Sequence, residues 1–305
     1  MIKFLNHNQI NRMHWDKCVK ESEVNLPYAL FDYLNVVSPN WGGVVFESEN
    51  SYEWVFPLPI KKKWGLKYLT QPLFTQQLGF YYKRKPSVDE RRQVINLLRT
   101  KYWLIDIADN CSCETTEDLE LVGIDRLTHL LELSKSYEEI RSGYNSNRKR
   151  ALKSIPETLT LKSSDSILKL LEMFELSKGS EVEGFDEKAK KLLIKLSTNE
   201  KIQNMFKVYY VENENLAIAG GFFVEFNDKL IFLFGATSLT GKRLNAMTYL
   251  FDKIIKNFSS TNKILDFEGS LIDGVSQFYR SFGGEKKMFK QMRYSKIPLF
   301  VRNEK

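Results

Sequence analysis

The chain has 305 residues, and its 45 lysines and arginines against 38 aspartates and glutamates give a net charge of +7 at neutral pH. Hydrophobic residues make up 43% of the chain, which is enough for a large core, so this length predicts a globular protein of two domains. The longest apolar run is about half the ~20 residues that span a bilayer, and the N-terminus lacks the apolar core of a signal peptide, so we expect a cytoplasmic protein without a transmembrane segment.

The first half of the chain is predicted to form strands, a long loop, a helix and a further strand. Residues that are β-branched or aromatic predict strands at 52–59, 65–72 and 102–109. An apolar stripe with helical spacing predicts a helix at 87–101. The loop at 73–86 is longer than the usual connection between elements, so we expect it to bind substrate. Its candidate substrate-binding residues are Gln76 and Gln77.

Between the two halves the chain is predicted to run from a strand through an amphipathic helix that ends in a basic cluster. We place the domain boundary here, which gives an N-terminal domain at 1–140 and a C-terminal domain at 141–305. The basic cluster holds Arg148 near the aromatic Tyr144. This combination is typical of contact with RNA or phosphate, and it is more often a solvated helix face. Tyr144 and Arg148 are candidate substrate-binding residues.

The second half contains the clearest elements. Apolar stripes predict helices at 166–178 and 186–196. Three strands follow within 206–238, and two short turns connect them into an antiparallel meander. A loop at 239–245 then leads into a helix at 246–258, whose apolar residues recur at helical spacing.

A short strand at 263–267 follows this helix, and a second short helix ends at a pair of glycines. Asn245 is placed to cap the start of the 246–258 helix. The order strand, helix, strand implies a right-handed crossover and a parallel pair, and ligands of such units bind at the carboxyl ends of the strands. We therefore expect a site near residues 235–245 and 268–270.

The loop before the 246–258 helix combines a glycine with two basic residues. Gly241 would let the backbone approach a ligand, Lys242 and Arg243 would bring positive charge, and the free N–H groups of the next helix point to the same place. This pattern predicts a pyrophosphate site. The same residues are also consistent with a solvated turn that has two incidental basic residues. The candidate cofactor-binding residues are Ala236, Thr237, Gly241, Lys242, Arg243, Asn245 and Ala246.

Two acids and a tyrosine come later in the same half. Asp266 and Glu268, two residues apart on a strand, would point to one side and, at its end, would reach the ligand crevice instead of the core. One of them could act as a general base toward an amine, whereas carboxylates at strand ends also commonly cap a helix or pair with an arginine. Tyr279 is either a core tyrosine beside Val275 and Phe282 or a proton donor that emerges between the strands. The candidate catalytic residues are Tyr279, Glu268 and Asp266.

The cysteines and histidines favour no metal site. Cys18, Cys111 and Cys113 are too few for a disulfide framework, and with three histidines the chain offers no recognised zinc spacing. We expect unpaired thiols in a reducing compartment, no metal and no tightly bound cofactor.

Three segments resemble the C-terminal half of the Fem family, the duplicated GNAT-like transferases that add amino acids to peptidoglycan precursors: GATSLTGKRLNAMTYLFDKIIK, LDFEGS and GVSQFYRSFGG. The match covers residues near 128–294 well, including NSNRKRALK, whereas the first half matches mainly in the order of its elements. The resemblance implies an α/β (α+β) fold of two GNAT-like domains, each a mixed sheet flanked by helices, with the active cleft between them. It also implies that a C-terminal strand at 293–305 returns to the first domain.

One position in the last segment separates two acyl donors. In the Fem transferases this motif resembles Phe-Lys-x-x-Phe-Gly, whose lysine is implicated in aminoacyl-tRNA transfer, and here the lysine position holds Tyr279. GNAT acetyltransferases carry a motif similar to Tyr-x-x-x-Gly, whose tyrosine protonates the leaving CoA thiolate, and Tyr279 with Gly283 fits it. The loop pattern Gln/Arg-x-x-Gly-x-Gly/Ala fits less well, because Ser238 and Arg243 occupy its outer positions.

The resemblance therefore implies an N-acyltransferase that moves an acyl group from acyl-CoA, as co-substrate, to an amine on a cell-envelope precursor such as an amino sugar or a cell-wall peptide. One alternative is a Fem-type transferase that uses aminoacyl-tRNA, which would contact the basic residues at 83–85 and 148–153. Another is a non-catalytic GNAT-like binding module. The expected partners are a small acyl donor and an amine-bearing acceptor, with tRNA less favoured.

Overall fold

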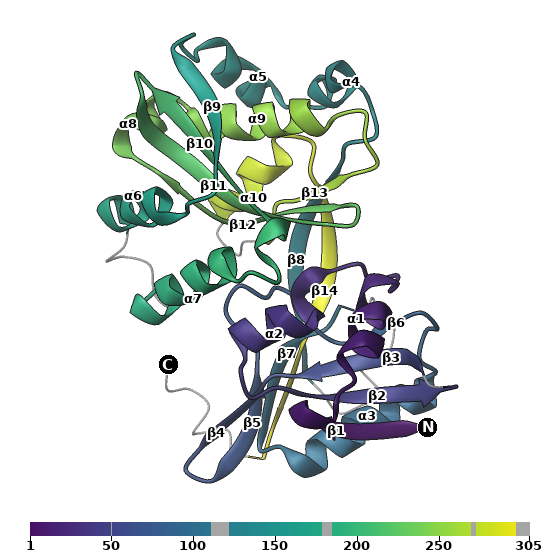
Figure 1. The fold of residues 1–305 in the computed structure, drawn as a ribbon. Helices are drawn as coiled ribbons and strands as arrows, with labels where there is room; N and C mark the ends of the chain where they lie inside the picture. Colours follow the sequence, from purple (N-terminus) through teal and green to yellow (C-terminus); the bar gives the residue numbers. More distant parts are fainter. Residues whose placement is uncertain (50, 111–121, 179–184, 270–272, 297–305) are drawn as a thin grey trace. The chain divides into compact units, whose positions relative to one another are not determined.

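The computed structural model describes residues 1–49, 51–110, 122–178, 185–269 and 273–296 (Figure 1). The chain divides into two compact units: unit 2 comprises Leu127–Lys287, and unit 1 comprises Met1–Arg126 with the segment that begins at Met288. This division falls before the predicted one at residues 140 and 141, because β8 (Val122–Glu132) pairs with a strand of unit 2. Among the described residues no helix combines the length and the apolar character needed to cross a membrane.

Unit 1 is built from two groups of paired strands and the helices that flank them. In the first group all pairs are antiparallel, and the order is β1 (Ile2–Asn6), β2 (Gly42–Ser48), β3 (Ser51–Leu58) and β6 (Tyr81–Tyr82). In the second group the order is β4 (Ile60–Lys63), β5 (Leu66–Thr70), β7 (Leu104–Ala108) and β14 (Glu285–Ser295). The helices are α1 (Arg12–Lys20), α2 (Phe31–Val37) and α3 (Val88–Lys101), with 3₁₀ turns at His7–Gln9 and Pro27–Ala29.

The strand, helix, strand order predicted for the first half is confirmed. β5 and β7 pair in parallel, and α3 connects them. α3 begins with a reciprocal cap, in which the Ser87 hydroxyl accepts the N–H of Glu90 at 3.2 Å and the Glu90 carboxylate accepts the N–H of Ser87 at 2.7 Å. β14 pairs with β7 as far as Ser295. Residues 297–305 of the strand predicted at 293–305 lie outside the described residues.

Unit 2 is a mixed sheet flanked by helices. Its strand order is β8, β13 (Ile264–Asp266), β12 (Lys229–Thr237), β11 (Leu216–Phe226), β10 (Phe206–Asn213) and β9 (Leu159–Ser164). Its helices are α4 (Tyr137–Ser142), α5 (Ser146–Lys153), α6 (Leu168–Lys178), α7 (Glu187–Thr198), α8 (Leu239–Arg243), α9 (Ala246–Phe258) and α10 (Asp273–Arg280), with a 3₁₀ turn at Gln203–Met205. The predicted meander is confirmed in β10, β11 and β12, and the predicted parallel pair is confirmed in β12 and β13.

Two segments of unit 2 differ from the sequence prediction. The single helix predicted before the basic cluster is in fact two, α4 and α5, because Gly143 ends α4 and Asn145 caps α5 by accepting the N–H of Arg148 at 2.8 Å. The predicted loop at 239–245 contains the short helix α8, which the side chain of Ser238 caps. A helix this short carries too little apolar periodicity to be recognised in a sequence.

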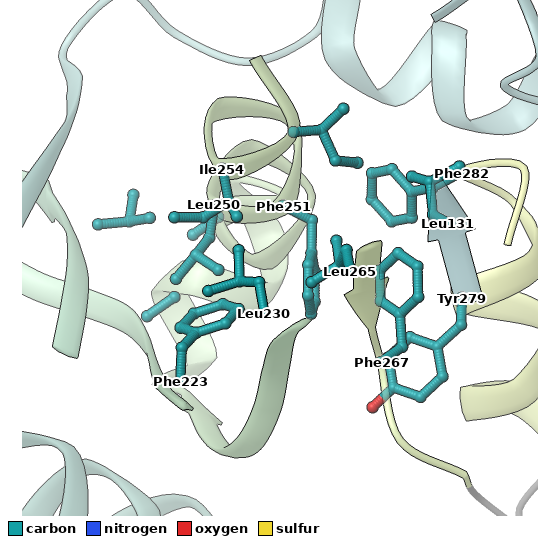
Figure 2. Packing of buried hydrophobic residues seen from close by; sticks show 14 of the residues in the cluster. Leu131, Phe223, Leu230, Leu250, Phe251, Ile254, Leu265, Phe267, Tyr279 and Phe282 are labelled. Atoms are coloured by element: carbon teal, nitrogen blue, oxygen red, sulfur yellow. The ribbon is translucent and has the colours of Figure 1, made fainter. Parts of the chain in front are cut away.

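An aromatic cluster forms much of the core of unit 2, with Phe223, Phe251, Phe267, Tyr279 and Phe282 in it (Figure 2). The ring centroid of Phe251 lies 5.1 Å from that of Phe267 and 5.6 Å from that of Phe282. Tyr279 stacks on Phe267 with centroids 5.1 Å apart. Full burial of one such side chain contributes about 1.5–3 kcal/mol, so the cluster fixes α9 and α10 against the sheet.

Candidate functional site

A pocket of about 680 Å³ lies in unit 2 at the carboxyl end of β12. Its walls come from the end of β12, from α8 and the start of α9, from α10, from two positions on α6 and from one position on α5. We call it the unit 2 pocket. The predicted site residues that line it are Arg148, Ala236, Thr237, Gly241, Lys242, Asn245 and Tyr279.

The apolar wall of this pocket was not predicted from the sequence. Besides the predicted residues, its lining includes Phe174, Phe232, Met247, Phe251, Val275 and Phe278. The residues on α9 and α10 were predicted to be apolar stripes of helices that face the core. A stripe that buries a helix can also line a cavity, so spacing alone does not separate the two roles.

Glycine is required at position 241 for a reason that differs from the predicted one. A Cβ atom at this position would lie 2.1 Å from the carbonyl oxygen of Ile218, so only glycine lets α8 pack on the backbone of β11. The N–H of Gly241 donates to Ser238 Oγ at 3.0 Å. The close approach is therefore to a neighbouring strand, and the amide of Gly241 already has an intramolecular partner.

The other residues of the predicted phosphate loop separate into two groups. Lys242 lines the unit 2 pocket and is exposed, so its ammonium group can reach a ligand there. Arg243 and Ala246 are absent from the described lining of the pocket. Arg243 is exposed, with Nη2 at 3.4 Å from Thr240 Oγ1 of its own helix, and Ala246 is fully buried in the core.

The start of α9 lacks the cap that the sequence predicted. Asn245 adopts a left-handed backbone with φ +54°, and its side chain makes no capping bond to the helix. Its Nδ2 lies 3.4 Å from Ser154 Oγ instead. Met247 and Thr248 of the first turn line the pocket. The amino end of α9, with its partial positive charge, therefore borders the pocket without a side-chain cap.

Arg148 is held in the pocket by neutral partners. Its Nε donates to Ser281 Oγ at 2.9 Å, and its Nη1 donates to Thr248 Oγ1. The guanidinium carbon lies 4.2 Å from the ring centroid of Phe278 and 4.7 Å from that of Phe282. Burial lowers the pKa of Arg148 to about 10, so the side chain stays cationic at neutral pH.

Tyr279 lines the unit 2 pocket, and most of its side chain is buried. Only 9% of the residue is exposed, and the hydroxyl lies at the edge of the aromatic cluster (Figure 2). No hydrogen bond joins this hydroxyl to any of the described residues. Burial raises the pKa of Tyr279, and the charges of Glu268 and Asp266 raise it further, so the phenol is protonated at neutral pH.

Asp266 corrects the expectation that both acids reach the crevice. It is 2% exposed, and its Oδ1 accepts the hydroxyl of Thr128 at 2.5 Å and the N–H of Glu268 at 2.8 Å. Burial raises the pKa of Asp266. β13 ends at Asp266, and Glu268 lies beyond it with φ +56°, so strand alternation does not relate the two side chains. Glu268 is half-buried.

The remaining substrate-binding candidates lie elsewhere. Tyr144 is 2% exposed and belongs to the core, where its ring centroid lies 5.3 Å from that of Phe282, which corrects its prediction as a substrate-binding residue. Gln76 and Gln77 belong to unit 1. Gln77 is buried, and its Nε2 donates to Gln76 Oε1 at 2.7 Å.

The cysteine prediction is testable at one position. Cys18 is a free thiol, and burial raises its pKa to about 12, which makes it a poor nucleophile at neutral pH. Cys111 and Cys113 lie outside the described residues. Across the described ranges no cluster of three or more His, Cys, Asp or Glu side chains could hold a metal ion.

The fold is similar to several solved structures over most of the chain. FemX matches with a TM-score of 0.68 at 12% identity, over 92% of this chain and 96% of that one. A tandem GNAT protein from the clavulanic acid biosynthesis pathway matches with a TM-score of 0.55 at 8% identity, over 96% and 98%. A GNAT-family acetyltransferase from Colwellia psychrerythraea matches with a TM-score of 0.52 at 10% identity, over 97% and 100%.

No protein-family model and no curated protein matches the sequence. At identities this low, the likeness to the solved structures concerns the arrangement of elements and not the chemistry. The predicted resemblance to the Fem transferases is confirmed at that level. The chain therefore has the fold of FemX and of the tandem GNAT protein.

Proposed function

We propose that the protein is an N-acyltransferase that moves an acyl group from acyl-CoA to an amine on a cell-envelope precursor. The observation that carries the proposal is the protonated phenol of Tyr279, which lines the unit 2 pocket beside an apolar wall. The Tyr279 to Gly283 motif favours CoA as the donor, and the resemblance to the Fem transferases supplies the class of acceptor.

The proposed reaction gives Tyr279 and Glu268 complementary roles. The amine nitrogen attacks the thioester carbonyl carbon, a C–N bond forms and the C–S bond breaks. The departing thiolate takes the phenolic proton of Tyr279, and the nitrogen loses its proton to Glu268. That proton then returns to the phenolate, which restores both groups. Glu268 is half-buried and its charge raises the pKa of the Tyr279 phenol, but Glu268 is absent from the described lining of the unit 2 pocket, so its role rests on the proposal alone.

Turnover of Tyr279→Phe tests the proposal. The substitution keeps the ring stacked on Phe267 and removes the transferable proton, so we expect kcat with acyl-CoA to fall by about 10²- to 10⁴-fold with little change in donor affinity. Tyr249→Phe is the matched control, because the Tyr249 hydroxyl donates to the Leu159 carbonyl at 2.7 Å and Tyr249 is absent from the described lining of the pocket. A fully active Tyr279→Phe protein would remove this residue from the mechanism.

Aminoacyl-tRNA is the second candidate donor. Arg150 and Lys153 of α5 are exposed, and basic side chains on one helix suit a phosphate backbone. Turnover measured with charged tRNA and with acyl-CoA separates the two donors. Transfer from charged tRNA alone would replace CoA in the proposal, and a chain that neither donor stabilises against heating would be a binding module instead of an enzyme.

A further inference from the structure

Arg148 has hydrogen-bonding capacity that the protein leaves unused. A guanidinium group carries five N–H donors, and the bonds to Ser281 and Thr248 use one on Nε and one on Nη1. The second Nη1 proton and both Nη2 protons have no partner among the described residues. The rings of Phe278 and Phe282 hold the group in place, so these donors are fixed in direction before any ligand binds.

The charge of Arg148 is also unbalanced. Both of its acceptors are neutral hydroxyl groups, and no carboxylate within the described ranges forms an ion pair with it. A partly buried cation without a counter-ion is destabilising, and proteins normally pair such groups. An arginine held this way beside a pocket is suited to an anion that arrives with the ligand, because its paired N–H groups match the oxygens of a phosphate.

The position of Arg148 within the pocket indicates which anion this is. Its Nη1 bonds to Thr248, which lies in the first turn of α9, where the amide groups have no side-chain cap. Lys242 lines the same pocket. A fixed guanidinium, a flexible ammonium group and the positive end of a helix of 13 residues therefore border the same pocket. A ligand group with two adjacent negative charges can bind these three positive groups better than a single carboxylate can.

We propose that Arg148 binds the diphosphate group of the acyl-CoA donor. The proposal rests on the proposed function. It keeps the start of α9, which the sequence already predicted to face the phosphates, and it assigns to Arg148 the contacts predicted for Gly241 and Arg243. It makes Arg148 a donor-binding residue and leaves the acceptor to other parts of the protein.

The test compares CoA affinity in four proteins by calorimetry. Arg148→Gln retains a donor for Ser281 and loses the charge, so we expect the Kd for CoA to rise by about 10- to 100-fold. Arg148→Lys retains the charge without the paired N–H groups, and its Kd should lie between those of wild type and Arg148→Gln. Arg150→Gln is the matched control, because Arg150 is exposed on the same helix, and its Kd should stay within about threefold of wild type.

Shortened donors locate the phosphate that Arg148 contacts. Pantetheine, which has no phosphate, should bind wild type and Arg148→Gln equally. Dephospho-CoA, which keeps the diphosphate and lacks the 3′-phosphate, should show the same penalty for Arg148→Gln as CoA does. A penalty that disappears with dephospho-CoA would overturn the proposal in favour of the 3′-phosphate. An unchanged Kd for CoA, with only the acceptor KM raised, would overturn it in favour of the acceptor.

Inorganic pyrophosphate separates this inference from the proposed function. If wild type binds neither CoA nor acyl-CoA, the proposed function fails, and the assignment of the donor fails with it. Stabilisation of wild type by pyrophosphate, lost in Arg148→Gln, would then show that Arg148 still forms an anion site. Melting temperatures without ligand identify any variant that has not folded. If Arg148→Gln does not fold, the CoA affinity of Arg148→Lys is compared with that of wild type instead.

Discussion

The two units share a pair of parallel strands connected by a helix. They differ in what lies at the carboxyl end of the first strand of that pair. In each unit a helix connects two parallel strands: α3 connects β5 and β7, and α9 connects β12 and β13. In unit 1 the side chain of Gln71, just after β5, accepts the N–H of Ala108 at 3.0 Å and donates to the carbonyl of Thr75 at 2.7 Å. In unit 2 the end of β12 opens into a pocket.

This difference shows that the strand arrangement supplies a place for a site, and that side chains decide its use. Gln71 uses its amide group to bridge backbone groups of its own unit, which stabilises the local fold. The corresponding part of unit 2 has a fixed cation and a protonated phenol beside the cavity. Substitutions in the two units should therefore affect stability and ligand binding in different proportions.

The largest expected effect is on stability and tests whether the units unfold separately. Phe251→Ala removes a fully buried ring from the centre of the unit 2 core, so we expect a loss of about 3–5 kcal/mol. Phe80→Ala is the matched change in unit 1, where the ring centroid of Phe80 lies 4.8 Å from that of Phe56. Hydrogen exchange should show lost protection mainly in the substituted unit. Equal losses in both units would show that the chain unfolds cooperatively as a whole.

Most of the fold could be predicted from local sequence, because apolar spacing and turn residues act over short distances. α9 follows from its apolar stripe, and the meander of β10, β11 and β12 from β-branched residues between turns. The surroundings of Arg148 could not be predicted, because its partners Thr248 and Ser281 lie 100 and 133 residues away in the chain. The burial of Asp266 was missed because its strand has only three residues and the chain turns immediately after it.

Asp266 provides a closer comparison with Gln71, since each bonds to a backbone amide at the end of a strand. Burial raises the folded-state pKa of Asp266 above the ~3.9 of an unfolded aspartate. The folded protein therefore binds more protons in this range, and this group's contribution to the free energy of unfolding is present below about pH 4 and is lost as the pH rises through the folded pKa.

Asp266→Asn keeps an oxygen acceptor for Thr128 and for the N–H of Glu268 and removes the ionisation. We expect a melting temperature at neutral pH equal to or above that of wild type. As the pH rises from about 4 to 7, the melting temperature of Asp266→Asn should decrease less than that of wild type. Turnover should stay within about threefold of wild type, because the Asp266 carboxylate is buried and already bonded to Thr128 and to the backbone of Glu268. A loss of turnover as large as that expected for Tyr279→Phe would return Asp266 to the mechanism.

The smallest expected effect separates two neighbouring basic residues of α8. Lys242 lines the unit 2 pocket, whereas Arg243 lies against Thr240 of its own helix. Because Lys242 is exposed, water and salt screen its charge, and Lys242→Ala should raise the Kd for CoA by only about two- to fivefold at low salt. Arg243→Ala should leave the Kd unchanged within error. Calorimetric titrations at low and high salt check both variants, since the Lys242 effect should diminish as salt is added. Equal effects of the two substitutions would mean that they act through the overall charge of the protein, and the pocket would then have no special relation to Lys242.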